Sequence, residues 1–357
     1  MKIPRNEYPR PQFVRKDWLC LNGKWQFEID YGNSGRERGL CDVELKGSIT
    51  VPFCPESKLS GVAHTDFMNV VWYRRKVKIP RGWSGRRILL HFQACDYDTT
   101  EVPADRDFSP MLDLTIKGKP RLWCVDDPHL YDLTIELLDG RGRIVDRMVS
   151  YAGLRSITID GRILRINGRR QFQRLVLDQG YYPDGIMTAP SDKALVKDIR
   201  LSMAAGFNGA RLHQKVFEER FLHHADRLGY LCWGEFADCG IDHDMPQVTG
   251  ITQWLEVLER DYSHPSIIGW CAINESWREI TDGISNLSDL TIGMFLAAKA
   301  MDQSRPVLDA SGHSHRVTGA DVYDSHDYEQ DPAVFAENHR GLADGRPLVN
   351  PNGGRPP

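Results

Sequence analysis

The chain has 357 residues, and its 45 lysines and arginines nearly balance its 49 aspartates and glutamates, giving a formal charge of −4. A chain of this length can form two or three domains with a well-buried core. The balance of charge gives no electrostatic case for nucleic acid or an anionic membrane as a partner. No apolar run approaches about 18 residues, and residues 1–5 include no apolar stretch. We therefore expect no transmembrane helix, no signal peptide and a cytoplasmic location.

The cysteines are scattered, and no two of them have the C-x-x-C spacing of a redox or zinc motif. Several lie inside apolar, strand-like runs, so we expect buried free thiols in a reducing compartment. The eight positions are Cys20, Cys41, Cys54, Cys95, Cys124, Cys232, Cys239 and Cys271.

Before about residue 160, short β-branched or aromatic runs alternate with turn residues, a pattern typical of an all-β sandwich. The runs that we expect to form strands are 24–29, 70–79, 87–92, 131–138 and 147–151.

After residue 160 the pattern changes to strands that alternate with helices, which indicates parallel β/α units. Ser191 is a predicted N-cap, and Gly206 and Gly229 are predicted helix stops. The expected strands are 171–176, 208–213, 230–236, 267–273, 306–310, 321–325 and 346–349, and the expected helices are 191–205, 218–227, 251–261, 289–301 and 333–340. This gives about seven strands, whereas a closed barrel needs eight.

The most informative segment is the apolar run 267–273, which follows a Ser-His-Pro turn and ends in Asn274-Glu275-Ser276-Trp277. Such a run predicts a buried parallel strand, and polar residues at its carboxyl end would point into the mouth of a barrel. An asparagine–glutamate pair there suits a general acid, with the amide holding a substrate hydroxyl. The alternative is an ordinary strand end capped by polar residues.

An ordered set of short motifs along nearly the whole chain resembles glycoside hydrolase family 2, the β-galactosidase and β-glucuronidase family. In the first half these motifs are Leu21-Asn-Gly-Lys-Trp25, Val51-Pro-Phe-Cys-Pro-Glu-Ser57, Val71-Trp-Tyr-Arg-Arg75, Asp127-Pro-His-Leu-Tyr131 and Gly153-Leu-Arg-Ser156. In the second half they are Ile166-Asn-Gly-Arg169, Gly206-Phe-Asn-Gly-Ala-Arg211, Trp233-Gly-Glu235, His264-Pro265 and Ile273-Asn-Glu-Ser276. The resemblance implies a jelly-roll sandwich over 1–104, an immunoglobulin-like sandwich over 105–157 and a TIM barrel over 158–357.

The resemblance also implies a retaining β-glycosidase that uses two carboxylates, most simply on terminal β-galactosides. Glu275 matches the acid/base, Asn274 the residue that holds the sugar 2-hydroxyl, and Arg211 an arginine that orders carboxylates at the barrel mouth. Glu235 would bind a sugar hydroxyl or a metal, or else form an ion pair with Arg211. Further residues expected at the mouth are Asp178, Gln179, Trp270, His326, Asp327 and Tyr328; for Asp178 and Gln179 a solvated loop is an equal alternative.

The chain departs from the family pattern in three places. After Val102 the pattern jumps to Gly118–Trp123, which suggests an internal deletion that leaves both sandwiches as remnants. The family's nucleophile is a glutamate that ends strand seven, but Asn350 or Pro351 stands there, and neither can form a glycosyl ester. The sequence then stops, so we expect the barrel to lack its last strand.

Several points stay open at this stage. Galactose, glucuronate and mannose are all candidate sugars, and a homo-oligomer is a further expectation. No cofactor is expected, although Glu235, Asp238 and Asp242 could offer oxygens to a magnesium or calcium ion; a solvated acidic loop is the alternative. The missing nucleophile also motivates a second hypothesis, a catalytically inactive glycan-binding protein, and a third, a remnant without a function of its own.

Overall fold

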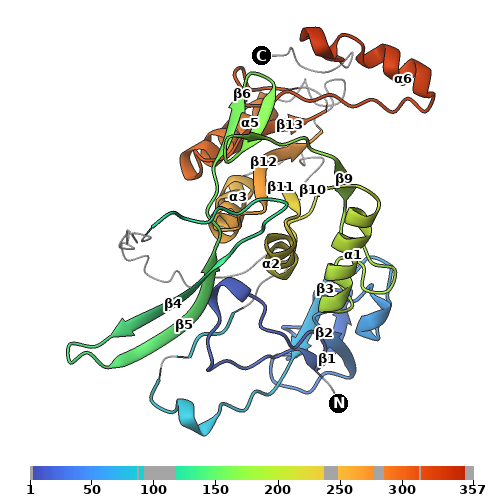
Figure 1. Cartoon of the computed structure of the whole chain (residues 1–357). Helices are drawn as coiled ribbons and strands as arrows, with labels where there is room; N and C mark the ends of the chain where they lie inside the picture. The colour runs from blue at the N-terminus through green and yellow to red at the C-terminus, as the bar shows by residue number, and fades with distance from the viewer. Residues whose placement is uncertain are drawn as a thin grey trace. The chain divides into compact units, whose positions relative to one another are not determined.

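A computed structural model of the chain describes residues 3–86, 88–91, 118–236, 248–275, 285–312 and 315–349 (Figure 1). Two compact units make up the chain. Unit 1 comprises Met1–Gly23, Thr50–Asp66 and Arg121–Pro357, and unit 2 comprises Lys24–Ile49 and Phe67–Pro120. The expected domain boundaries after residues 104 and 157 stay a prediction.

Unit 2 is built around a three-stranded sheet in the order β2-β1-β3, formed by β1 (Gly23–Asp30), β2 (Gly47–Val51) and β3 (Val70–Arg74). The expected strand 24–29 is confirmed as β1, and it pairs antiparallel with β3. The expected strand 70–79 ends earlier, at Arg74, although Val77 and Ile79 continue its alternation. Both side chains are more than 40% exposed, so burial does not hold this stretch as a strand.

The expected strand at 87–92 is wrong for the part that can be assessed. Residues 88–91 are irregular, and Leu89 and Leu90 are 59% and 62% exposed. Residues 87 and 92 lie outside the described part of the chain.

The β-rich part of unit 1 is a long hairpin followed by a small sheet. The expected strand 131–138 is confirmed as β4 (Tyr131–Leu138), and 147–151 lies within its antiparallel partner β5 (Ile144–Ala152). The Asp139 carboxylate accepts the backbone amides of Arg141 and Arg143, which closes the turn between them. Antiparallel strands β6 (Ile157–Asp160), β7 (Ile163–Ile166) and β8 (Arg169–Arg170) follow. Short 3-10 turns occur at Pro11–Phe13, Lys58–Ser60, Arg81–Trp83 and Leu342–Asp344.

The remainder of unit 1 is a five-stranded parallel sheet whose strands are neighbours in chain order, β9 to β13. The strands are β9 (Leu175–Asp178), β10 (Gly209–Leu212), β11 (Leu231–Glu235), β12 (Ile267–Asn274) and β13 (Val307–Ser311). The helices are α1 (Asp192–Ala204), α2 (Glu219–Leu228), α3 (Val248–Asp261), α5 (Ser285–Met301) and α6 (Pro332–His339). All five expected helices and the first five expected strands are thus present, with shifted ends.

Local chemistry sets the helix ends as expected. The Ser191 hydroxyl accepts the backbone amide of Ala194 at the start of α1. Gly229, with φ of 72°, ends α2 in the left-handed conformation.

The expected strands 321–325 and 346–349 are absent, and side-chain bonds explain the first. Asp321 accepts the backbone amide of Val307 (2.9 Å), and Asp324 accepts that of Gly312 (2.8 Å). Aspartate carboxylates therefore satisfy amides at both ends of β13, where a sixth strand would use backbone carbonyls. Residues 346–349 begin with a turn that Arg346 closes on the Gly341 carbonyl (2.9 Å).

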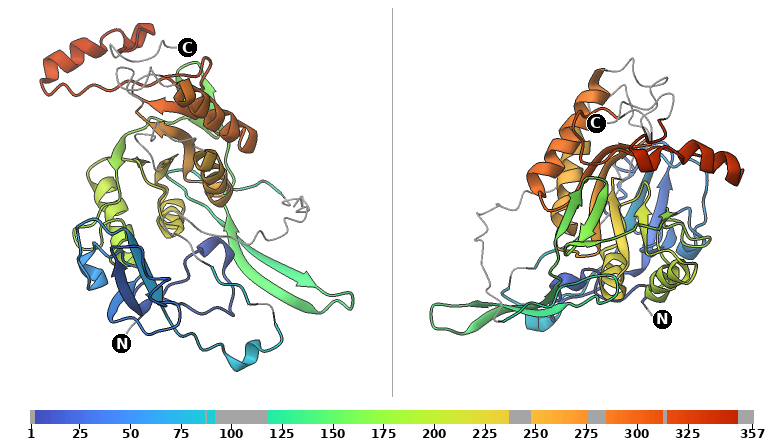
Figure 2. Two further views of the ribbon diagram at one scale, coloured as in Figure 1. Left: turned by 180° about the vertical axis from the view of Figure 1, so that it is seen from behind. Right: turned by 45° about the horizontal axis from the view of Figure 1, so that its top comes forward.

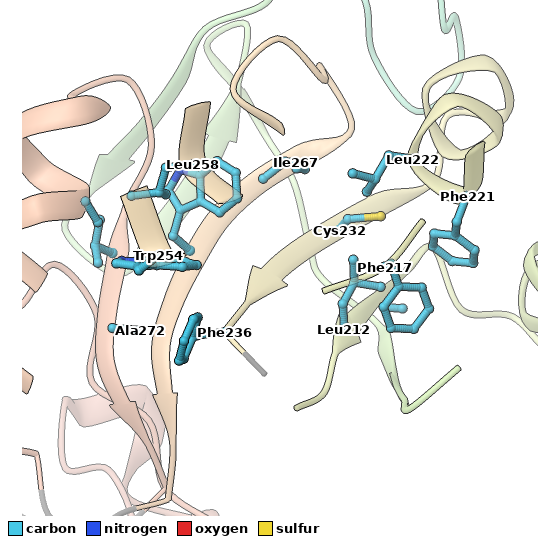
Figure 3. Packing of buried hydrophobic residues seen from close by; sticks show 14 of the residues in the cluster. Leu212, Phe217, Phe221, Leu222, Cys232, Phe236, Trp254, Leu258, Ile267 and Ala272 are labelled. Atoms are coloured by element: carbon cyan, nitrogen blue, oxygen red, sulfur yellow. The ribbon is translucent and has the colours of Figure 1, made fainter. Parts of the chain in front are cut away.

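The main hydrophobic cluster lies between the parallel sheet and the helices α1, α2, α3 and α5 (Figure 3). Figure 2 shows α3 and α5 beside each other, and both pack in this cluster. A second cluster includes Trp123, Ile166 and Trp233 together with residues of β12 and β13. Two tryptophans are accommodated by glycines on the neighbouring strand: the register pairs Trp233 with Gly269 and Gly234 with Trp270. A Cβ on either glycine would lie 2.6 Å from the facing indole ring.

The cysteine expectation is confirmed in part. Cys232 and Cys271 are free and buried, and burial raises the pKa of both thiols well above the usual value. Cys41 is free but exposed, so the expectation of burial is wrong there. Cys95 and Cys239 lie outside the described residues.

Candidate functional site

Four neighbouring strands bring one polar side chain each to the carboxyl edge of the parallel sheet. Arg211 comes from β10, Glu235 from β11, Asn274 from β12 and Ser311 from β13. The Arg211 guanidinium joins them: Nε donates to Glu235 Oε2 (2.6 Å), and Nη2 donates to Ser311 Oγ (2.6 Å) and to Asn274 Oδ1. The expected grouping of Arg211, Glu235 and Asn274 therefore forms.

Glu235 is a buried carboxylate whose oxygens are already engaged. Its side chain has no exposed surface; Arg211 contacts both oxygens, and the backbone amide of Gln214 donates to Oε1 (2.9 Å). A buried charge is tolerated when it is paired and hydrogen-bonded in this way. The expected ion pair between Glu235 and Arg211 is therefore present.

No group of three His, Cys, Asp or Glu side chains that could hold a metal ion occurs within the described ranges. Asp238 and Asp242, the other candidate oxygen donors, lie outside those ranges.

Asn274 and Ser311 form a fixed pair beside this ion pair. The register places them opposite each other, and the Ser311 hydroxyl donates to Asn274 Oδ1 (2.9 Å). Both residues are almost completely buried, at 2% and 0% exposure. Because Arg211 and Ser311 both bind Oδ1, the amide is oriented with Nδ2 as its donor group.

Glu275 follows β12 directly and is the carboxylate of this group that reaches solvent, with 18% of its side chain exposed. Its backbone φ is +43°, in the left-handed region that a glutamate rarely adopts. Its amide donates to Ser311 Oγ (3.3 Å), which ties this conformation to β13. Strained backbone of this kind persists only where the surroundings hold it, and it is common at active sites.

His326 and Tyr328 hold one oxygen of Glu275. His326 Nδ1 lies 2.7 Å from Oε1, and the Tyr328 hydroxyl donates to the same oxygen at 3.2 Å. Burial and the neighbouring carboxylate raise the pKa of Tyr328 above its usual value. These two residues were expected at the mouth, and the structure places them on the proposed acid.

Gly312 makes room for His326. Its φ is +71°, and a Cβ at this position would lie 2.4 Å from the imidazole ring of His326. Both the backbone conformation and the close approach therefore require glycine. The position of His326 against Glu275 depends on this glycine.

A buried group of hydrogen-bonded residues around His315, which we call the His315 staple, was missed by sequence reasoning. His315 Nδ1 lies 2.8 Å from Asp309 Oδ1, and its Nε2 lies 2.9 Å from the Asp324 carbonyl oxygen. Burial disfavours the charged imidazole, but the hydrogen bonds to Asp309 and Asp324 outweigh it and raise the pKa of His315 to about 10. The staple ties β13 to the segment that leads to His326. No sequence motif signals it.

The β9 end of the edge adds Asp178, Gln179 and a second missed residue, His213. The His213 amide donates to the Asp178 carbonyl (2.8 Å), and its Nδ1 lies 3.0 Å from Gln179 Nε2. Burial and the neighbouring Arg211 lower the pKa of His213. Burial raises the pKa of Asp178. Its position directly after the last residue of β10 was the available signal for His213.

Two expected residues lie elsewhere. Trp270 is completely buried and donates to Asp302 Oδ2 (2.8 Å), so it belongs to the core and cannot touch a sugar. Asp327 turns toward α6, where His339 Nε2 lies 3.0 Å from its Oδ2. Asn350 and Pro351, the expected replacements of the nucleophile, lie outside the described residues, as do Ser276 and Trp277.

His223 and His224 on α2 are half-buried. His224 Nε2 contacts Asp192 Oδ1 (2.9 Å), and burial lowers the pKa of His223 to about 4. In the described part of the chain, no helix has the length and apolar character needed to cross a membrane.

Comparison with known proteins places these observations in a family. The family model described as glycosyl hydrolases family 2 matches residues 93–155. The β-galactosidase of Lactococcus lactis is 28% identical over 200 residues, covering 53% of this chain and 19% of the relative. The β-galactosidase of Vibrio vulnificus is 27% identical over 215 residues, covering 57% and 20%. A putative β-glucuronidase of Formosa agariphila is 29% identical over 161 residues, covering 44% and 19%.

The chain spans about a fifth of the length of these curated relatives. Among solved structures, a Ruminococcus gnavus β-glucuronidase in complex with D-glucuronic acid is 26% identical with a TM-score of 0.48, covering 53% of this chain and 32% of that one. The matching family model and the family's β-galactosidases and β-glucuronidases among the relatives agree with the motifs along the sequence. These comparisons support glycoside hydrolase family 2 as the family of this chain.

Proposed function

We propose that this chain carries the acid/base side of a retaining glycosidase that acts on terminal β-glycosides, with β-galactosides as the preferred substrates. The observation that carries the proposal is Glu275, a partly exposed carboxylate held on a strained strand end by His326, Tyr328 and Ser311. The relatives that support the choice of galactoside are β-galactosidases.

The contacts of Glu275 suit a general acid. Among the described residues, His326 and Tyr328 both contact Oε1 of Glu275. Oε2 is therefore the oxygen that would give its proton to the leaving-group oxygen. In the second step the same oxygen would take a proton from the attacking water. His326 and Tyr328 would keep the carboxyl group in one rotamer during both steps.

Asn274 would hold the sugar 2-hydroxyl next to this acid. Its Nδ2 is oriented by the two bonds on Oδ1, and a contact to that hydroxyl strengthens as positive charge develops on the ring. Arg211 fixes this geometry through its bonds to Asn274, Ser311 and Glu235.

The arrangement of the parallel sheet supports the proposed barrel. Strands β9 to β13 are adjacent in chain order, and the helices between them pack in a single cluster with the sheet. A doubly wound sheet would reverse its strand order and place helices on both faces. Consecutive order with helices on one face is typical of a β/α barrel, whose active sites lie at the carboxyl ends of the strands. We propose that these five strands are part of such a barrel, and that the β-rich parts derive from the family's jelly-roll and immunoglobulin-like domains.

A second candidate function is glycan binding without turnover. A retaining mechanism needs a second carboxylate about 5–5.5 Å from the first. The other carboxylate of this edge, Glu235, is fully buried and bound by Arg211 and the Gln214 amide, so it is not available as a nucleophile. Together with Asn350 and Pro351 in the sequence, this observation favours a site that binds a sugar and does not cleave it.

The test is hydrolysis of aryl β-galactosides, β-glucuronides and β-mannosides by the parent and by Glu275→Gln. The glycosidase proposal predicts that the parent releases phenols from the galactoside, and that the variant loses about 10²–10⁴-fold in kcat, the usual contribution of a general acid. With a dinitrophenyl leaving group, which needs no proton, the first step in the variant should survive. Glu256→Gln, which removes an exposed carboxylate on α3, is the matched control and should keep full activity.

The outcomes separate the candidates. Unchanged turnover of the nitrophenyl galactoside by Glu275→Gln would rule out this residue as the acid. Saturable binding of galactose by the parent without release of phenol from any substrate would support the binding protein instead.

A further inference from the structure

The N-terminal segment of unit 1 contacts the loops that follow β9 and β10 through Arg5. One loop, residues 179–191, joins β9 to α1, and the other, residues 213–218, joins β10 to α2. Arg5 Nη1 and Nη2 donate to the two carboxylate oxygens of Glu218 (3.1 and 2.6 Å), and Nη1 also donates to the Ala189 carbonyl (2.8 Å). The Ala189 amide donates to Glu218 Oε1 (3.3 Å), so one guanidinium joins the far ends of both loops.

The Arg5 contact is buried and paired with carboxylates. Only 7% of its side chain is exposed. Burial disfavours the charged guanidinium, but Glu218 and Glu7 outweigh this cost and raise the pKa of Arg5 above its usual value. Two nitrogens that donate to one carboxylate form a bidentate pair, which fixes the direction of the contact as well as its distance. A lysine would supply the charge without this planar fork.

The near ends of the same two loops form one side of the candidate site. Gln179 Nε2 lies 3.0 Å from His213 Nδ1. The Gln214 amide donates to Glu235 Oε1 (2.9 Å), and Glu235 is the ion-pair partner of Arg211. A displacement of either loop would therefore reach the polar side chains at the carboxyl edge of the sheet.

Lys215 joins the two loops between their near and far ends. Its ammonium group, on the second loop, donates to the carbonyls of Gly180 (2.7 Å) and Met187 (2.8 Å) on the first. The first loop is held a third time where the Ser57 hydroxyl donates to the Asp184 carbonyl (2.6 Å). The contacts between Arg5 and the site thus form a continuous path of hydrogen bonds and short chain segments, through which a change at one end can alter the other.

Backbone strain marks the same path. The φ angle is +46° at Arg5, +58° at Ile186 and +53° at Gln214. For a β-branched residue such as Ile186 this left-handed conformation is a genuine outlier. Glu275, the proposed acid, has the same kind of backbone, with φ of +43°. Strain of this kind persists only where surrounding contacts hold it, and it is common at functional sites.

We propose that Arg5 is a positioning residue of the glycoside site. It fixes the two loops whose near ends carry Gln179, His213 and Gln214, and it acts through these loops. The inference rests on the proposed function, because it concerns the same site. Without the Arg5 fork the loops would adopt more than one arrangement, and binding of a sugar would have to order them again at a cost in affinity.

The direct test is calorimetric titration of the full chain with a thio-β-galactoside, which resists hydrolysis. Arg5→Gln removes both the charge and the fork and should weaken binding about tenfold. Arg5→Lys keeps the charge and should lose less. If Arg5→Gln does not fold, Glu218→Gln breaks the same ion pair, keeps an acceptor for the Ala189 amide, and should weaken binding in the same direction.

Arg10→Gln is the matched control. Arg10 belongs to the same N-terminal segment and forms an ion pair with Glu219, the residue of α2 next to Glu218 (2.9 Å). The control therefore removes a neighbouring ion pair of the same helix end without touching the Arg5 fork, and it should leave the affinity unchanged.

A second readout needs no bound sugar. Burial and the neighbouring Arg211 lower the pKa of His213 in the parent. Looser loops would expose His213 to water, so its pKa should rise toward the usual value in Arg5→Gln and stay low in Arg10→Gln. An NMR titration of the imidazole signals measures this difference. A role of Arg5 confined to the stability of the N-terminal segment would leave the pKa of His213 unchanged.

Three results would overturn the assignment of Arg5: parent-like affinity in Arg5→Gln, an equal loss of affinity in Arg10→Gln, or a pKa of His213 that is the same in the parent and in Arg5→Gln. A parent that binds no thiogalactoside would instead contradict the proposed function. The His213 titration would then still decide whether Arg5 positions the loops, so the two proposals can fail separately.

Discussion

The two ends of the parallel sheet each carry a buried acid within a polar network, but they differ in what they leave exposed. At the amino end, Asp226 and His264 are completely buried and 2.6 Å apart. At the carboxyl end, Glu235 is buried with Arg211, but the network continues outward to Glu275, His326 and the 70% exposed Tyr328. The comparison teaches that a sealed network holds elements together, whereas an open one presents groups to a ligand.

The amino-end network joins elements that are distant in the sequence. Asp226 accepts the Tyr151 hydroxyl (2.8 Å) and the Ser266 amide (3.0 Å) in addition to its contact with His264. The indole of Trp123 donates to the Asp226 carbonyl (2.7 Å). Burial disfavours the Asp226 carboxylate, but His264 and Ser266 outweigh it and lower its pKa. This end thus connects the hairpin to α2 and to the start of β12.

The largest effect is expected from removing the sealed acid. Asp226→Ala would leave the Tyr151 hydroxyl, the His264 Nδ1 and the Ser266 amide buried without their partner. Breaking a buried network of this kind costs about 3–5 kcal/mol, which urea unfolding followed by tryptophan fluorescence would measure. Asp160→Ala, which removes an exposed pairing with Arg165, should change the free energy of unfolding by less than about 1 kcal/mol. Equal losses in both variants would contradict the distinction between sealed and exposed pairs.

An intermediate effect is expected from filling the space beside His326. Gly312→Ala introduces both a strained φ of +71° and a Cβ that would overlap the imidazole ring. Gly319→Ala is a matched control, because Gly319 has a φ of +83° and no atom within 4 Å of its would-be Cβ. The free energy of unfolding should fall by about 1 kcal/mol in the control because of backbone strain. In Gly312→Ala it should fall by about 1 kcal/mol more, because the added Cβ also overlaps the His326 ring.

The same pair of variants separates stability from site geometry. Only Gly312→Ala should displace His326 from Glu275, which the imidazole signals in an NMR titration would report. If both variants left those signals unchanged, the close approach of Gly312 would not position His326.

The smallest expected effect is a pH dependence of the free energy of unfolding that comes from the His315 staple. The folded-state pKa of His315 is raised to about 10 from an ordinary value of 6.5. Its contribution to stability is therefore fully present below about pH 6.5 and is lost as the pH rises through about 10. The difference in the free energy of unfolding between the parent and His315→Gln should shrink over that interval. His129→Gln, on the hairpin side, is the control, and a constant difference for His315→Gln would contradict the shift.

Much of the parallel sheet was predictable because its signals are local. Buried strands show as short apolar runs, and Ser191 and Gly229 carry helix-end chemistry in their own side chains or backbone. Four site residues lie at or just after the ends of such strands, so they could be placed on one edge of the sheet for the same reason. They are Arg211, Glu235, Asn274 and Glu275. Their contacts could not be placed, since these depend on which strands become neighbours.

The wrong predictions concern residues whose positions depend on packing between neighbouring strands. Trp270 is buried in the core because Gly234 of the neighbouring strand leaves space for its indole ring. The sequence of one strand does not show that these two residues pair. The segment 321–325 has the composition of a strand but uses Asp321 and Asp324 side chains to bind β13. His213 and His315 carry no motif, and only their three-dimensional neighbours show that they support the site.

The measurement that tests the central claim most directly is equilibrium binding of thio-β-glycosides of galactose and glucuronic acid, which resist hydrolysis, to the parent and to Asn274→Ala. A site at the open end predicts saturable binding to the parent and its loss in the variant, whether or not the chain turns over substrate. Flat titrations of the parent with both sugars, or binding that Asn274→Ala leaves unchanged, would contradict the assignment of this edge as the glycoside site.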